Sequence, residues 1–498
     1  MTGRAEVARI IGRMAHGTRI SAIDASFLAR EKTGARLHVA SVTVFDGPAP
    51  SWDELREHVE ARLHLVPRFR QRLAEVPRNQ GRPVWVDDPH FNLRYHLRHA
   101  GLPAPGSEQQ LKTLAGRLFA QPLDRTKPLW EMWLVDRLGS GGFALIAKSH
   151  HALVDGISAL DITTVLFASE PDAPPPPPPA ERTWVAQPMP TPAQLLSDAL
   201  IERATHPEEL IHRAEAVLDV PRRLAETARD KLQAAGALAF AGRPPAPPSP
   251  LNVKVGPHRR YTWVDAELSQ LQAIKDSLGG TVNDAVLAVV AGALGRYLRH
   301  RAVDSRDLVL RTLVPIAVAA DDEDAALGNA VAPLAVGLPV GIEEPVAQYQ
   351  TIRDTTADLA GARRALGARA LTQLAGFASA TIISQAARLQ QSQPGFDLMV
   401  TNVPGPQFPL YLLGRRLRAL YPVVPITGRQ ALGIAVVSYD GRLCFGLLAD
   451  YDALPDVDVL ATELREAIDA LSSGASIPKR AARGRRRAAA RPSSTSVL

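Results

Sequence analysis

The chain has 498 residues, of which 46% are hydrophobic and 22% are charged, the balance of a globular protein with two or more domains. Its single cysteine, Cys444, excludes a disulfide framework and a cysteine-based metal site, and fits a reducing cytoplasm. The net charge of +6 comes from residues 479–498, which hold seven basic residues and no acidic one. The rest of the chain has no basic stripe interleaved with aromatic residues, so we expect no specific nucleic-acid partner. No apolar run is long enough to span a bilayer.

Hydrophobic periodicity and capping residues predict alternating strands and helices over residues 20–170, the first subdomain. Ser51, with Glu54 three residues later, and Ser107 are placed as helix N-caps. An N-terminal extension of residues 1–19 precedes this unit and is not a convincing signal peptide. The predicted elements are strands at 37–45, 131–138 and 143–149 and helices at 51–65 and 107–120.

A proline-rich linker is expected over residues 171–257. The run Pro174–Pro179 is typical of an extended spacer. It is followed by a helical insert over 192–240, with Thr191 as the cap and Pro192 in the first turn. The linker therefore separates two structured units.

The second subdomain is expected over residues 258–478, followed by a disordered basic tail at 479–498. Its predicted elements are strands at 261–264, 307–318, 331–340, 397–402, 431–438 and 442–450, with helices at 267–278, 285–298 and 457–472, the second of these opened by Thr281. Two α/β (α+β) halves of similar size, joined by a crossover, are the coarse result.

The most informative motif is His150-His151 followed by Asp155-Gly156. The apolar run at 143–148 predicts a buried strand that ends at the histidines, where layered α/β folds build their sites. Histidine is the side chain best suited to move protons near neutral pH. A pair of histidines satisfied in an ordinary loop is the alternative, but the full spacing after a strand favours a catalytic site.

Several further blocks accompany this motif over residues 20–472. They are Asp24-Ala25-Ser26-Phe27-Leu28, Pro128-Leu129-Trp130, Val282-Asn283-Asp284, Leu327-Gly328-Asn329, Thr401-Asn402-Val403-Pro404-Gly405-Pro406 and Ser438-Tyr439-Asp440-Gly441. Together with the HHxxxDG pattern, they resemble the bacterial wax ester synthase/diacylglycerol acyltransferase family of the CoA-dependent acyltransferase superfamily.

The resemblance implies two chloramphenicol-acetyltransferase-like subdomains joined by a helical crossover linker, with the active site in the channel between them. It implies transfer of a long-chain fatty acyl group from acyl-CoA to diacylglycerol, forming triacylglycerol. Wax ester synthesis from long-chain alcohols is the related possibility. Acyl-CoA is then a co-substrate, and no cofactor is implied.

The same resemblance assigns roles at the motif. His151 is expected to be the general base on the acceptor hydroxyl, and His150 to support its position. Asp155 is expected to hold the loop, with Arg311 as a candidate partner, and Gly156 to allow the close turn.

Four other residues fall on family positions. Asn283 has the chemistry of an oxyanion donor, and a helix-capping role is equally open. Trp130, Glu31 and Asp284 are candidates for substrate binding. A core position for Trp130 and a surface position for Glu31 are the alternatives.

The other histidines give no metal site. His96 and His99 fall in a segment with a strand pattern, which would put their rings on opposite faces. His38, His90 and His258 are isolated and are interpreted as ordinary surface or core residues.

Two other functions remain open. One is a condensation-type or polyketide-associated acyltransferase that takes its acyl group from a carrier protein. The other is a non-catalytic lipid-binding protein. In every case we expect a cytoplasmic protein associated peripherally with the inner membrane face or with lipid droplets, through the basic tail or the 192–240 segment.

Overall fold

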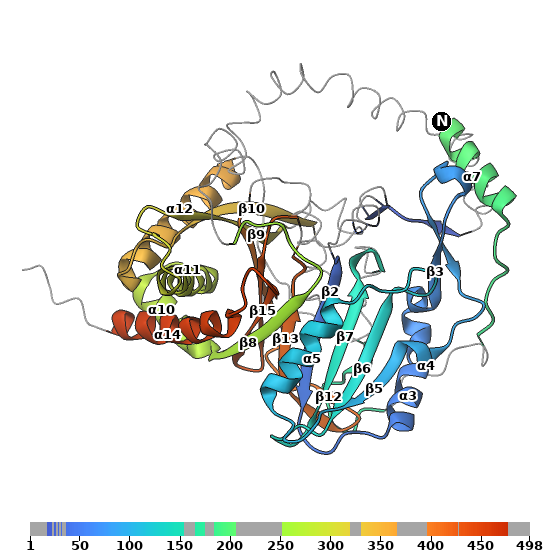
Figure 1. Ribbon diagram of the computed structural model, residues 1–498, viewed down its shortest axis with the longest axis horizontal. Coiled ribbons are helices and arrows are strands. Elements are labelled where there is room, and N and C mark those ends of the chain that lie inside the picture. Colours follow the sequence, from blue (N-terminus) through green and yellow to red (C-terminus); the bar gives the residue numbers. More distant parts are fainter. Residues whose placement is uncertain are drawn as a thin grey trace, which may run out of the picture.

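The computed structural model contains two halves that lie side by side, each built on a β-sheet (Figure 1). It describes residues 17–21, 24–25, 28, 31, 36–153, 165–174, 184–205, 251–318, 330–365, 396–426 and 428–476. The predicted mixed α/β architecture with two units is confirmed.

The elements of the first half follow the alternation expected from the sequence. They are β1 (Thr18–Arg19), β2 (His38–Phe45), α3 (Trp52–Glu60), β3 (Gln71–Ala74), β4 (Val84–Asp87), α4 (Leu93–His96), β5 (Leu97–Gly101), α5 (Glu108–Ala120), β6 (Trp130–Asp136), β7 (Phe143–His150) and α7 (Pro192–Thr205). Short 3₁₀ turns are present at Leu63–Leu65, Pro67–Arg70, Pro77–Asn79 and His151–Leu153.

The second half begins with a strand and two consecutive helices. Its elements are β8 (Arg259–Glu267), α10 (Leu268–Leu278), α11 (Val282–His300), β9 (Val309–Val318), β10 (Ala330–Pro339), α12 (Pro345–Ala365), β11 (Leu398–Pro404), β12 (Tyr411–Leu412), β13 (Arg415–Val423), β14 (Leu432–Tyr439), β15 (Arg442–Asp450) and α14 (Val457–Ser476).

The first large sheet has the order β12-β13-β2-β7-β6-β5. Its two outermost strands on one side, β12 and β13, come from residues 411–423, which the sequence analysis placed in the second subdomain. Because β13 pairs antiparallel with β2, with Leu420 opposite Thr43, the chain returns to complete the first sheet. The two halves are therefore interlocked by a shared sheet.

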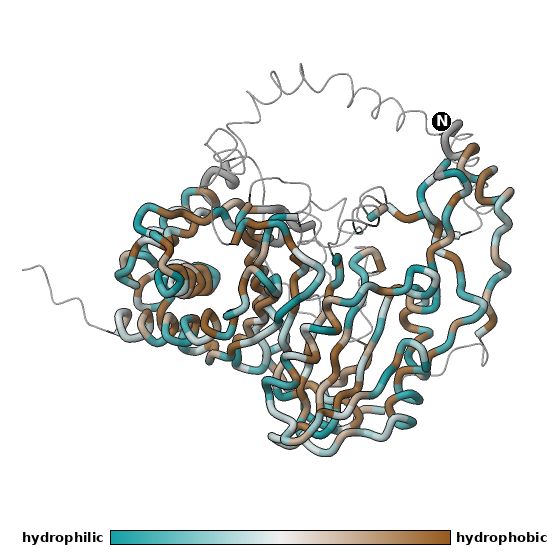
Figure 2. The backbone as a smooth tube through the Cα atoms, viewed as in Figure 1, coloured by the Kyte–Doolittle hydropathy of each residue, from teal (hydrophilic) through white to brown (hydrophobic). Residues whose placement is uncertain are grey.

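The second large sheet has the order β10-β9-β11-β14-β15-β8, in which β11 runs parallel to both β9 and β14. Helices α10, α11, α12 and α14 cover one face of it (Figure 1). The middle helix of this layer, α11, is hydrophobic along most of its length and buried, as Figure 2 shows in brown. Apolar side chains of the helices and the sheet form one core.

A second core joins the two halves. It contains Val42 and Ile146 from the first sheet, together with Tyr261 and Trp263 from β8. The Trp263 ring stacks on Tyr421 of β13, with ring centroids 4.6 Å apart. One face of the first sheet is therefore buried against the second half.

A three-stranded sheet in the order β1-β4-β3 flanks the first half, and α7 packs on it through Leu195 and Ala199 (Figure 1). The helix predicted at the start of the 192–240 segment is thus present as α7. Residues 206–250 lie outside the described part of the chain, as do 1–16 and 477–498, so the rest of the linker, most of the N-terminal extension and the basic tail stay predictions.

Two local predictions differ from the structure. The helix expected at 51–65 ends at Glu60 and is followed by a 3₁₀ turn. The strand expected around His96 and His99 begins only at Leu97, because Asn92 caps a short helix by accepting the N–H of Arg94.

Within the described ranges, no single helix is long and apolar enough to cross a membrane. The pair α10 and α11 together has that length and composition, but it is bent by 103° at the break. Both helices belong to the core described above.

Candidate acyl-transfer site

The histidine pair lies at the end of β7, where this strand meets the start of β2. The antiparallel register places His38 opposite His150 and Ala40 opposite Lys148. Because side chains alternate along a strand, Ile146, Lys148 and His150 share one face. Ile146 belongs to the core that joins the two halves, so this face is turned toward the second half.

His150 is held by three contacts. Its backbone N–H donates to the carbonyl of Leu129, which brings the Pro128-Leu129-Trp130 block next to the histidines. Its ring Nδ1 accepts the backbone N–H of Ala152 at 3.1 Å. A nitrogen that accepts cannot carry a proton, so the proton of the neutral ring is on Nε2. The Nε2 atom lies 3.4 Å from Glu31 Oε1.

Glu31 links the two strands to the N-terminal segment. Its Oε1 accepts the backbone N–H of Leu37 at 2.9 Å, and its Oε2 binds Arg125 at 2.8 Å. Burial alone raises the pKa of Glu31, but its contact with His150 and the Leu37 N–H that it accepts hold that pKa well below its usual value. The side chain is only 11% exposed, so the surface position considered for it is wrong.

His38 belongs to this cluster, although the sequence analysis set it aside as an isolated histidine. Its Nε2 lies 3.8 Å from Glu31 Oε1, and its ring meets that of His150 edge-on. Burial, followed by the charge of Lys148, holds the pKa of His38 well below its ordinary value, so the ring is neutral. The signal that would have identified His38 is the pairing of the two predicted strands, because their antiparallel register places His38 opposite His150.

His151 starts the 3₁₀ turn that follows β7. Its backbone N–H donates to the carbonyl of Leu37, and its ring stacks on that of His150 with centroids 4.8 Å apart. Its Nδ1 lies 3.6 Å from Oδ1 of Asp24, and both side chains are 1% exposed. Asp155 and Gly156, the other members of the motif, lie outside the described residues, so the proposed partnership of Asp155 with Arg311 stays a prediction.

Lys148 is a buried cation that sequence reasoning missed. Its Nζ donates to the carbonyls of Leu118 and Gln121 at the end of α5 and lies 3.5 Å from Glu131. Burial lowers the pKa of Lys148 and the charge of Glu131 opposes that shift. Lys148 thus caps α5 beneath the histidines.

Trp130 lies on the other face of the same sheet. Its indole N–H donates to the carbonyl of Phe69 at 2.8 Å, and its ring stacks on His96. Glu131 lies opposite Lys148 and shares its face of the sheet, so its neighbour Trp130 points to the other face. Trp130 is therefore buried in the hydrophobic core on that other face and does not lie beside His150.

Asn283 and Asp284 lie at the start of α11. Thr281 and Asp284 form the capping box of this helix, and Thr356 donates to the second carboxylate oxygen of Asp284 at 2.6 Å. Asn283 is therefore not the capping residue. Its side-chain oxygen accepts from Asn402 of β11 at 3.4 Å, which joins two of the sequence blocks.

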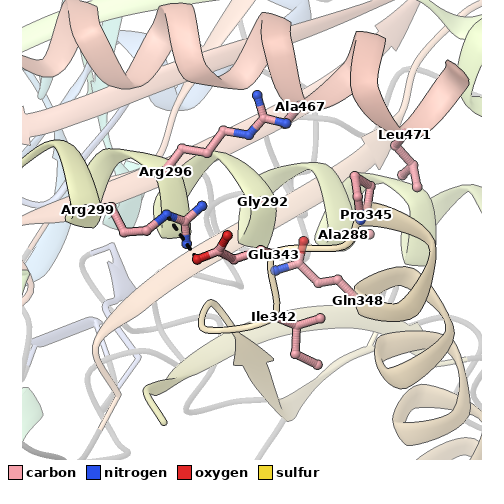
Figure 3. A pocket seen from close by; sticks show the side chains of 10 residues that line it. All are labelled: Ala288, Gly292, Arg296, Arg299, Ile342, Glu343, Pro345, Gln348, Ala467 and Leu471. Atoms are coloured by element: carbon pink, nitrogen blue, oxygen red, sulfur yellow. Dashed lines mark ion pairs between the residues drawn. The ribbon is translucent and has the colours of Figure 1, made fainter. Parts of the chain in front are cut away.

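A separate hollow lies among α11, α12 and α14, on the covered side of the second sheet (Figure 3). Arg299 points toward Glu343 across it, 3.9 Å away, and Arg296 pairs with Glu466. These pairs satisfy the charges of the hollow, and none of the histidine-site residues lines it. Among the residues that the structure describes, no group of three or more His, Cys, Asp or Glu side chains is arranged to hold a metal ion.

Comparisons with known proteins agree with the sequence blocks over most of the chain. The profile of the wax ester synthase/diacylglycerol acyltransferase catalytic domain matches residues 20–286, and that of the family's C-terminal domain matches residues 327–472. A probable diacylglycerol O-acyltransferase of Mycobacterium tuberculosis (strain H37Rv) is 33% identical over 478 residues, covering 94% of this chain and 98% of that protein.

Solved structures give the same result. The wax ester synthase/diacylglycerol acyltransferase from Marinobacter aquaeolei VT8 superposes with a TM-score of 0.64 at 26% identity, covering 92% of this chain and 100% of that one. The first condensation domain of the calcium-dependent antibiotic synthetase, at 16% identity, covers 93% of this chain and 97% of its own with a TM-score of 0.54, and so shares the fold. By the length and order of these matches, the chain belongs to the wax ester synthase/diacylglycerol acyltransferase family.

Proposed function

We propose that this protein transfers a long-chain fatty acyl group from acyl-CoA to diacylglycerol, forming triacylglycerol. The observation that carries the proposal is the position of His151, buried after β7 with its Nδ1 facing a carboxylate. The relatives of similar length are named as diacylglycerol O-acyltransferases, which favours diacylglycerol as the acceptor.

His151 is the general base in this proposal. Its Nε2 takes the proton of the acceptor hydroxyl while the oxygen attacks the thioester carbonyl. The carbon–sulfur bond then breaks, and the departing CoA thiolate receives the proton from His151. Because a thioester is already activated, no covalent enzyme intermediate is needed. No prosthetic group takes part in these steps.

His150 supports the reaction without exchanging a proton. Its Nδ1 is occupied by the Ala152 N–H and its Nε2 faces Glu31, so the ring holds the turn that carries His151. Asn283, joined to Asn402, is proposed as the amide that faces the developing oxyanion.

The acceptor is tested with purified protein and palmitoyl-CoA, offered diolein or hexadecanol separately. We expect thiol release and triacylglycerol with diolein. Wax ester formation from hexadecanol would add the second activity named for the Marinobacter relative. Transfer only from a palmitoylated carrier protein, or lipid binding with no turnover, would overturn the proposal in favour of the condensation-type or the binding function.

We propose further that the protein contacts a membrane or lipid-droplet surface, where its lipid acceptor is found. The segment that carries α7 exposes Val185 at 74% and Ile201 at 46%, together with Leu200 and Met189. Leu200 and Ile201 belong to α7, whereas Val185 and Met189 precede it. Exposed apolar side chains clustered on one segment favour insertion at a lipid interface.

Flotation with liposomes of phosphatidylcholine and phosphatidylglycerol tests this contact. Val185→Asp with Ile201→Asp is expected to reduce the bound fraction several-fold, whereas Leu65→Asp, an exposed leucine in the first half, serves as the matched control. Unchanged flotation of the double variant, with loss on deletion of residues 479–498, would assign binding to the basic tail instead.

A further inference from the structure

Two buried carboxylates from the N-terminal segment face the two histidines separately. Glu31 lies 3.4 Å from Nε2 of His150, whereas Asp24 lies 3.6 Å from Nδ1 of His151. The adjacent rings therefore present opposite nitrogens to a carboxylate, although they stack on one another at 29°. This difference decides which nitrogen of each ring carries the proton.

Asp24 is itself held by a local hydrogen-bonded turn. The Ser21 hydroxyl donates to Asp24 Oδ2 at 2.5 Å, and the backbone N–H of Asp24 donates back to Ser21 Oγ at 3.0 Å. With Oδ2 fixed in this way, Oδ1 is the oxygen that is turned to His151. Asp24 is 1% exposed, and a buried carboxylate is costly unless polar partners compensate it.

We propose that Asp24 is the positioning residue for His151. Its carboxylate keeps the proton of the neutral ring on Nδ1, leaves Nε2 as the basic atom, and stabilises the imidazolium that forms when the hydroxyl proton is taken. The proposal rests on the proposed acyl transfer and names the group that orients its base. The distance of 3.6 Å is longer than a hydrogen bond, and such contacts in ligand-free sites tighten in the substrate complex.

The different partners of the two Nδ1 atoms explain why His151 acts as the base and His150 does not. The Ala152 N–H donates to Nδ1 of His150 and so fixes the proton of that ring on Nε2, whereas the carboxylate that faces Nδ1 of His151 fixes its proton on Nδ1. Only His151 then has an Nε2 lone pair. The carboxylate that orients the base thus comes from the sequence block beginning at Asp24.

The variant Asp24→Asn tests this role because it keeps size and shape. An asparagine amide can donate to Nδ1, which moves the ring proton to Nε2 and removes the base. We expect kcat for diolein acylation to fall by about 10²–10⁴-fold with KM within about threefold. Ser21→Ala, which frees Oδ2, is expected to lower kcat about tenfold. Asp46→Asn, an exposed aspartate after β2, is the control.

The direct readout is the ¹⁵N NMR spectrum of histidine-labelled protein at pH 8.5, with His150→Asn and His151→Ala for assignment. We expect the Nδ1–H form for His151 in the wild type and the Nε2–H form in Asp24→Asn, whereas His150 keeps Nε2–H in both. A His151 proton on Nε2 in the wild type, or one that Asp24→Asn does not move, would overturn the proposal. Because the spectrum needs no turnover, failure of the proposed acyl transfer is scored separately by the acceptor assay.

Discussion

The Nδ1 atom of His150 accepts the backbone N–H of Ala152, two residues further along the chain. This local hydrogen bond closes the turn that carries His151, and it makes Nδ1 of His150 an acceptor. The Nδ1 contact therefore needs a side-chain acceptor near the backbone and not a basic ring. The consequence is testable with two substitutions.

His150→Asn is expected to retain more activity than His150→Ala. The asparagine Oδ1 can replace Nδ1 as the acceptor of the Ala152 N–H, whereas alanine leaves that buried N–H unpaired at a cost of about 1–3 kcal/mol. We expect kcat of His150→Ala to be at least about tenfold below that of His150→Asn, with the same order in thermal stability. Equal loss in both variants would contradict this account and assign the role of His150 to its Nε2, which faces Glu31.

Glu31→Gln is expected to change how stability depends on pH. A carboxyl group whose pKa is lower in the folded protein than in the unfolded chain stabilises the fold above its unfolded value, here 4.5, and this contribution is lost as the pH falls. The wild type should therefore lose stability more steeply than the variant below about pH 5. At pH 7 the free energy of unfolding of the wild type should exceed that of Glu31→Gln by about 1–3 kcal/mol.

Urea unfolding between pH 3 and pH 7 measures this difference. Glu60→Gln, at a position 62% exposed on α3, is the control and should follow the wild type. Parallel curves for the wild type and Glu31→Gln would contradict the charge state assigned to Glu31.

Asp284→Ala is expected to act on stability and not on substrate binding. The substitution removes the capping box of α11 and the contact with Thr356, at a cost of about 1–2 kcal/mol. Thermal unfolding should show a lower Tm, while KM for palmitoyl-CoA stays within twofold. A raised KM at an unchanged Tm would instead place Asp284 at the substrate.

Lys148→Met is expected to destabilise the first half strongly, because it removes the buried cation that faces the carboxylate of Glu131. Breaking one partner of a buried ion pair costs about 3–5 kcal/mol. The double variant with Glu131→Gln should recover part of this loss, although Arg98 also pairs with Glu131. A double-mutant cycle in urea measures the coupling, and full additivity of the two losses would argue against the pair.

Local patterns in the sequence predicted most elements and the position of the motif. The capping boxes at Ser51, Ser107 and Thr281 are all present, because they depend on residues three apart. The strand before the histidines is also present, and its near-continuous apolar run reflects burial on both faces.

The features that the sequence analysis missed depend on distant partners. The strand β13 begins with three arginines among its first four residues, and it joins the first sheet through its pairing with β2, in the other half of the chain. The burial of Glu31 likewise follows from its contacts with His150 and Arg125, which no local pattern reveals. His38 is in the site only because of strand register.

The measurement that most directly tests the central claim is acyl transfer by His151→Ala beside the wild type, with palmitoyl-CoA and diolein. His99→Ala, which changes an exposed histidine of β5 paired with Asp136 at the end of β6, is the matched control. We predict that His151→Ala loses triacylglycerol formation by at least about 10²-fold while its fold and the control's activity are retained. Activity of His151→Ala close to that of the wild type would contradict the assignment of His151 as the general base.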